Sequence, residues 1–156
     1  MAMANDSAAG LTTEYVTVTI GDHLFGLPIF RVQDVFVPDR LTRVPLAPPE
    51  VAGILNLRGR VVTAIDMRAR LDLGARLPGT PVMAIGIEHK GESYGLLVDA
   101  VGEVMALRDS ACEAKPGNLD PRLSQVAAGI YRLEGQLMVV LDVDRVLDIR
   151  NGAVAA

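Results

Sequence analysis

Apolar and polar residues alternate over short stretches of this chain, and turn-forming residues separate these stretches. Residues 15–20, YVTVTI, alternate strictly, are followed by the turn GDH, and lead into a second apolar run. Residues 82–87, VMAIGI, do the same before the turn EHKGE. Alternation with a period of two, followed by a turn that contains glycine, is typical of a β-hairpin with one buried face. The pattern therefore predicts a mainly β protein.

The two predicted hairpins belong to an internal repeat. The segment FGLPIFRVQDV at 25–35 aligns with YGLLVDAVGEV at 94–104, with a constant shift of 94 − 25 = 69 positions. The segment AGILNLRGRVVTAID at 52–66 aligns with AGIYRLEGQLMVVLD at 128–142, with a shift of 142 − 66 = 76. Two related halves, each rich in short strands, predict two small barrels or curled sheets that share one core, with about ten strands in total.

A short helix is predicted in front of the second aligned segment in each half. Proline is the first residue of the segment 48–53 and the second residue of the segment 120–129, and proline suits the first turn of a helix. Asp120 can cap the second of these helices. Gly53 and Gly129 stand where such helices would end.

The candidate catalytic groups are few. Asp66 and Asp142 each precede a short apolar-periodic run, so a helix N-cap explains both carboxylates. The rival interpretation is a small acid/base enzyme that uses Asp66, Asp142 and a histidine, which requires these groups to converge in one pocket. His23 and His89 fall in predicted turns, where an exposed imidazole is the ordinary outcome, and neither has a partner at metal-ligand spacing. Cys112 has no evident base nearby that could activate its thiol. From these residues together we expect neither catalysis nor a cofactor.

Composition narrows the classes of partner. Aromatic residues make up only 4% of the chain and Trp is absent, which leaves few rings to stack on bases. The net charge of −4 also lacks the cationic field that nucleic acid or an anionic membrane surface requires. A single cysteine fits a reducing compartment, the cytoplasm. No apolar run approaches the ~18 residues of a membrane span, so any membrane association is expected to come through a partner.

The sequence also predicts how the chain is divided. Residues 1–11 and 151–156 are small and polar or alanine-rich, which is typical of disordered or flexible tails. One domain is predicted between them, at 12–150. The start at Met1 and the short C-terminal tail favour a chain that is not a fragment of a larger protein.

The two halves differ in charge at one hairpin tip. NLRG at 56–59 becomes RLEG at 132–135, so Arg58 in the first half corresponds to Glu134 in the second. Leucine and glycine are kept at both tips, as the turn requires, while the other side chains diverge. A charge reversal between equivalent positions favours a functional role for Arg58 over that of a solvated turn residue.

Several motifs together resemble the CheW family of bacterial chemotaxis coupling proteins. They are VAGILNLRGRVVTAIDMR at 51–68, LTRVP at 41–45, FGLPIFRVQDV at 25–35 and YGLLVDAVGEV at 94–104, and the resemblance covers about residues 14–149. It implies two intertwined, SH3-like, five-stranded β-barrels without catalytic activity. It also implies an adaptor between the cytoplasmic tip of a methyl-accepting chemoreceptor and the regulatory domain of the histidine kinase CheA. A CheW-type adaptor of another chemosensory pathway, such as surface motility or second-messenger control, is the alternative.

The resemblance also implies a receptor-binding surface. Its predicted residues are Val32, Asp34, Gly53, Asn56 and Arg58. The chain departs from the family pattern at Asp34, where glutamate is common, and at Thr63 and Ala64, where the family often has Pro-Val. Asp34 and Glu103 are also equivalent positions of the repeat, and both are expected to be exposed acids at the end of the second strand of their hairpins.

Overall fold

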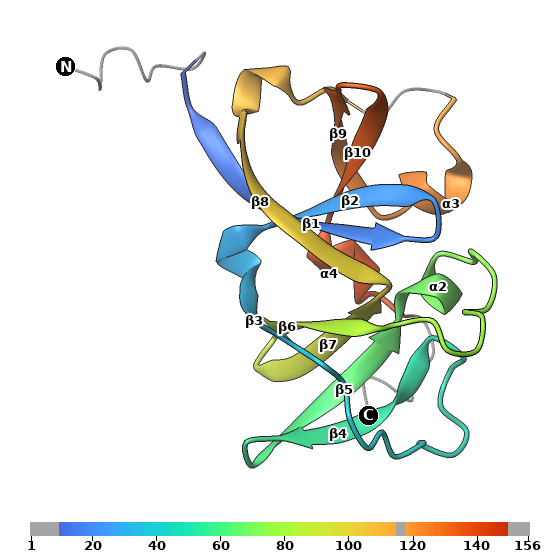
Figure 1. Cartoon of the computed structure of the whole chain (residues 1–156). Helices are drawn as coiled ribbons and strands as arrows, with labels where there is room; N and C mark the ends of the chain where they lie inside the picture. Colours follow the sequence, from blue (N-terminus) through green and yellow to red (C-terminus); the bar gives the residue numbers. More distant parts are fainter. Residues whose placement is uncertain (1–9, 115–117, 150–156) are drawn as a thin grey trace.

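The computed structural model describes residues 10–114 and 118–149, which form a mainly β fold (Figure 1). The strands are β1 (Thr12–Ile20), β2 (His23–Pro28), β3 (Val32–Phe36), β4 (Val51–Leu57), β5 (Arg60–Asp66), β6 (Met83–His89), β7 (Glu92–Val98), β8 (Ala100–Arg108), β9 (Ala127–Leu133) and β10 (Gln136–Leu141). The short helices are η1 (Ile29–Arg31), α2 (Met67–Arg70), η2 (Asp109–Ala111), α3 (Pro121–Ser124) and α4 (Val143–Val146). No helix in these ranges is long and apolar enough to span a membrane. The predicted tails lie outside the described residues apart from positions 10 and 11, so the division of the chain stays a prediction.

The strands form two five-stranded sheets, and each sheet contains strands from both halves of the chain. Sheet A has the order β8-β1-β2-β10-β9, and sheet B has the order β3-β6-β7-β5-β4. In each sheet, the first hairpin of one half lies among three strands of the other half. Under the two shifts of the repeat, every strand of sheet A corresponds to the strand at the same place in sheet B. The halves have thus exchanged their first hairpins.

Strand register confirms that the halves are structural repeats. In sheet A, β10 runs parallel to β2 and Val139 pairs with Phe25. In sheet B, β5 runs parallel to β7 and Thr63 pairs with Tyr94. The shift of 76 relates Thr63 to Val139, and the shift of 69 relates Phe25 to Tyr94. The two parallel pairings are therefore the same pairing made twice.

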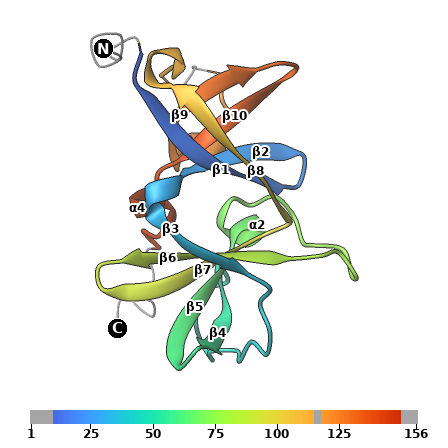
Figure 2. The same ribbon diagram turned by 60° about the vertical axis from the view of Figure 1, so that its left-hand side comes forward.

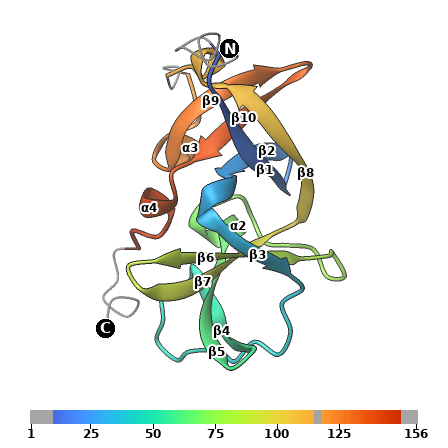
Figure 3. The same cartoon turned by 90° about the vertical axis from the view of Figure 1, so that its left-hand side faces the viewer.

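One hydrophobic core joins the two sheets, as the sequence predicted. Its largest cluster of buried side chains includes Val18 and Phe25 from sheet A, together with Ile65 and Ile85 from sheet B. Each of these four residues is 0% exposed. The sheets lie one above the other, with α2 and α4 near the level where they meet (Figure 2). Figure 3 shows α4 and β8 on opposite sides of this junction.

Aspartates begin the three short α-helices, as predicted. The carboxylate of Asp66 accepts hydrogen bonds from the backbone N–H groups at the start of α2, and Asp142 does the same for α4. Asp120 accepts from the N–H of Arg122 at the start of α3, and Pro121 occupies the first turn. These carboxylates satisfy N–H groups that a helix leaves without partners, so capping accounts for their positions.

The predicted helix at 48–53 is wrong. Residues 48–50 form a turn, and Val51 already belongs to β4, where it pairs with Ile65. In the second half, α3 ends at Ser124 and Gly129 lies within β9. A strand that buries one face in the core outweighs a weak local helix signal, so neither glycine ends a helix.

Candidate functional site

The tip of the β4–β5 hairpin is a two-residue turn that presents Arg58 to solvent. Arg58 and Gly59 both have positive φ angles, 54° and 84°, which is the backbone of a hairpin turn matched to the strand twist. The side chain of Asn56 accepts a hydrogen bond of 2.9 Å from the N–H of Gly59. Asn56 and Gly59 therefore stabilise the turn, and the Arg58 side chain, 77% exposed, lies outside it.

Arg58 contacts another predicted site residue, Asp34. Its Nη1 lies 3.5 Å from Oδ2 of Asp34 in β3, although β3 and β4 form opposite edges of sheet B. Curling of the sheet brings the two residues together. The Asp34 side chain is only 22% exposed, and its Oδ1 is buried with no hydrogen-bond partner among the described residues. Asp34 is thus half-buried within β3, a strand separate from the β1–β2 hairpin. The expectation of an exposed acid at the end of the second strand of that hairpin is wrong.

The ion pair leaves most of the Arg58 guanidinium available. One long contact to an exposed arginine contributes only about 0–1 kcal/mol to stability, because water screens it. A guanidinium has five N–H donors, and the contact with Asp34 engages one nitrogen. Arg58 can therefore bind a carboxylate or several backbone carbonyls of a partner while Asp34 limits its orientation.

The other two predicted site residues face inward. Val32 is partly buried and packs against the main hydrophobic cluster. Gly53 is buried in β4, where Thr42 and Ile54 exchange backbone hydrogen bonds of 2.8 Å. A Cβ atom at Gly53 would lie 2.5 Å from the carbonyl oxygen of Thr42. The structure therefore groups Asp34, Asn56 and Arg58 at the surface, and the part of Val32 and Gly53 in binding stays a prediction.

We expect Gly53→Ala to destabilise the fold by about 1–3 kcal/mol, because the added methyl group overpacks the contact with Thr42. Denaturant unfolding would measure this loss. Hydrogen exchange of the Thr42 and Ile54 amides should also become faster, since their mutual hydrogen bonds must lengthen.

Gly53 and Gly59 both have positive φ angles, 155° and 84°, but a Cβ atom at Gly59 would meet no atom within 4 Å, so Gly59→Ala is the matched control. It should leave the exchange of the Thr42 and Ile54 amides unchanged. Equal acceleration in both variants would mean that general destabilisation, and not the local contact, is responsible.

The groups considered for catalysis do not converge. Asp66 and Asp142 cap different helices. The expectation of an exposed imidazole is wrong for His89, whose side chain is 13% exposed and lies 3.2 Å from Asp144. His23 opens β2 and is half-buried. Within the described ranges, no three His, Cys, Asp or Glu side chains form a group that could hold a metal ion.

Cys112 is an exposed free thiol. Desolvation raises the pKa of the Cys112 thiol above its usual value, and this effect outweighs the hydrogen bond from Tyr131. A raised pKa keeps the thiol protonated near neutral pH, and the thiolate is the reactive form. The structure thus gives Cys112 no feature of a nucleophile.

The model of the CheW-like domain family matches residues 14–151 of this sequence. The chain belongs to the CheW-like family. Chemotaxis protein CheW of Rhizobium meliloti (strain 1021) is 30% identical over 85% of this chain and 86% of that protein. Chemotaxis protein CheW of Helicobacter pylori (strain ATCC 700392 / 26695) is 25% identical over 86% of this chain and 81% of that protein.

A solved structure supports the same assignment. The crystal structure of scaffolding protein TtCheW from Thermoanaerobacter tengcongensis superimposes with a TM-score of 0.80 and 27% sequence identity, covering 90% of this chain and 95% of that chain. Family, relatives and fold agree with the resemblance of the NLRG and associated motifs. This CheW-like chain therefore has the two-domain SH3-like fold of an adaptor in chemotaxis.

Proposed function

We propose that this CheW-like protein couples methyl-accepting chemoreceptors to the histidine kinase CheA in the cytoplasm. The receptor's cytoplasmic tip binds at the surface formed by Asp34, Asn56 and Arg58 on sheet B. The regulatory domain of CheA binds elsewhere on the chain. The role is that of a noncatalytic adaptor, and no cofactor takes part. The relatives described above are named as chemotaxis proteins, which favours this pathway over surface motility or second-messenger control.

The exposed Arg58 is the observation that carries this proposal. It stands at a tip whose equivalent in the other sheet carries Glu134, so the two ends of the molecule present opposite charges at matched positions. A binding surface of about 1,200 Å² or less suffices for a transient signalling contact. Each end can thus hold a surface of adequate size for a different partner.

Purified components test the proposal. The chain is titrated with a chemoreceptor cytoplasmic fragment and, separately, with the CheA regulatory domain, and then both are added together. We expect two binary complexes and one ternary complex on size-exclusion chromatography. Absence of binding to either partner would contradict the proposal.

A further inference from the structure

A cluster of charges joins the two sheets on the side of the junction where β7 leads into β8. Asp99 occupies this connection and accepts hydrogen bonds from two nitrogens of Arg68 in α2, Nε at 3.1 Å and Nη2 at 2.6 Å. The same carboxylate accepts a hydrogen bond of 2.8 Å from the N–H of Gly21, in the β1–β2 turn of sheet A. The Nε of Arg76 lies 3.7 Å away. One side chain thus contacts elements of both sheets.

This cluster is shielded from solvent. The side chains of Arg68 and Asp99 are 16% and 14% exposed, and that of Arg76 is 19% exposed. Burial opposes ionisation of Asp99, but the hydrogen bonds from Arg68 and Gly21 outweigh it, so the pKa of this carboxyl lies below its ordinary value. Two-point contacts between a guanidinium and a carboxylate fix direction as well as distance. The cluster is therefore suited to hold the two sheets at one relative angle.

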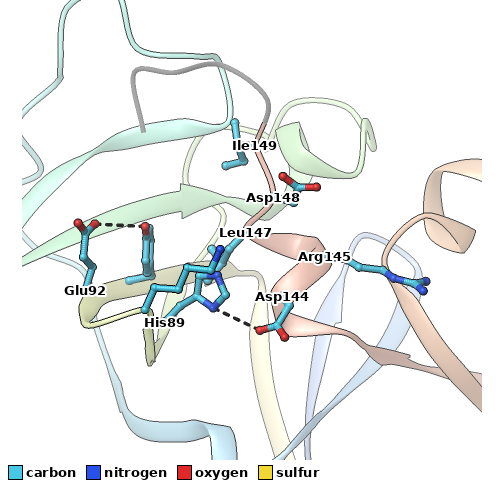
Figure 4. A pocket seen from close by; sticks show the side chains of 9 residues that line it. His89, Glu92, Asp144, Arg145, Leu147, Asp148 and Ile149 are labelled. Carbon is cyan, nitrogen blue, oxygen red and sulfur yellow. Dashed lines mark hydrogen bonds and ion pairs between the residues drawn. The ribbon is translucent and has the colours of Figure 1, made fainter. Parts of the chain in front are cut away.

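The internal repeat supplies a comparison on the opposite side of the junction. The shift of 76 relates Arg68 to Asp144 in α4, and the shift of 69 relates Asp99 to Phe30 in η1. Here Asp144 contacts Arg31 at 3.4 Å and His89 at 3.2 Å. The side chain of Asp144 is 68% exposed. Asp144 and His89 line a cavity of about 640 Å³, and Figure 4 shows their side chains pointing toward each other. The ion pairs of Asp144 are thus exposed, although Arg70 in α2 donates hydrogen bonds of 2.8 Å to the carbonyls of Arg145 and Val146 in the same helix, α4.

We propose that Asp99 is a positioning residue that sets the angle between the two sheets, and thereby the angle between the two partners of the adaptor. The link to binding rests on the proposed function. Without the Asp99 carboxylate, the guanidinium groups of Arg68 and Arg76 lose their shared counter-ion in a partly buried place. The exposed ion pairs of Asp144 add little to this constraint, because water screens them.

Pulsed electron resonance on spin labels tests the positioning role without any partner. One label is placed on sheet A through Leu137→Cys, and the other on sheet B through Val61→Cys, both at exposed strand positions. The parent chain carries Cys112→Ser, so that only these two sites react. We expect one narrow distance distribution in the parent and a broader one after Asp99→Asn. The matched control Asp144→Asn should keep the parent distribution.

A parent-like distribution in folded Asp99→Asn would overturn the proposal, and so would equal broadening in Asp144→Asn. If Asp99→Asn does not fold, Arg68→Lys takes its place, because lysine keeps the charge but loses the two-point contact. Broadening is again expected, and a parent-like distribution in Arg68→Lys would overturn the positioning role.

Binding gives a second readout that a purely structural role would not move. In Asp99→Asn, each partner alone should bind with parent affinity. The cooperativity factor, which is the affinity of one partner for the binary complex divided by its affinity for the free chain, should fall towards one. An unchanged factor would contradict the link to the adaptor's geometry. If the unmodified chain binds neither partner, the proposed function fails, whereas the spin-label result still decides the role of Asp99.

Discussion

Replacing Arg58 with glutamate should abolish most binding to a chemoreceptor cytoplasmic fragment and leave the fold intact. The side chain is 77% exposed and its contact with Asp34 is long, so stability should change by only about 0.5 kcal/mol. Receptor binding should weaken by roughly 2–5 kcal/mol. The reason is that the substitution removes the cation from a contact with the receptor that the complex shields from water, and puts a negative charge in its place. Calorimetric titration measures the affinity, and circular dichroism with thermal melting checks the fold.

The repeat provides the control for Arg58→Glu. Glu134→Arg makes the reverse change at the equivalent tip of sheet A and should spare receptor binding. Arg58→Glu should also bind the CheA regulatory domain nearly as the parent chain does. If Arg58→Glu binds receptor with parent affinity, the tip is only a solvated turn and the proposed surface is wrong.

The second large effect is expected at Ile65, where alanine should destabilise the protein by about 2–5 kcal/mol. Ile65 is 0% exposed in β5 and belongs to the cluster that joins the two sheets. Truncation leaves a cavity whose lining comes from both sheets. Denaturant unfolding measures the loss as a lower transition midpoint with an unchanged slope.

Val61→Ala is the matched control because Val61 lies in the same strand but is 61% exposed. Its effect should stay within about 0.5 kcal/mol. A similar loss in both variants would mean that alanine acts through strand propensity, and the assignment of Ile65 to the shared core would then lack support.

Much of the fold could be predicted because its determinants repeat or act locally. The alternation around residues 15–20 and 82–87 identified hairpins, and the aspartate before each short apolar run identified helix caps. The helix predicted at 48–53 failed since its prolines and glycine are local signals, whereas the pairing of Val51 with Ile65 depends on the sheet. A strand that buries more apolar surface is favoured over the helix that local signals predict.

The site was predictable only in part. Comparison of the two halves drew attention to Arg58, and the family resemblance added Asp34. Their contact could not be inferred, because 24 residues separate them and only curling of sheet B brings them together. The pairing of Arg68 with Asp99 could not be predicted from the sequence for the same reason. Such contacts depend on how strands from distant parts of the chain are arranged.

The exchanged hairpins have a consequence for the history of the molecule. Neither half contains a whole sheet, since sheet A takes β1 and β2 from the first half and β8, β9 and β10 from the second, while sheet B takes β6 and β7 from the second half and β3, β4 and β5 from the first. Each half holds one strand of every kind that a sheet needs, so two copies of a single half could form the same two sheets as a domain-swapped homodimer. Two identical copies would carry the same charge at both tips. Joining the halves in one chain breaks that symmetry, so that arginine can stand at one end of the molecule and glutamate at the other.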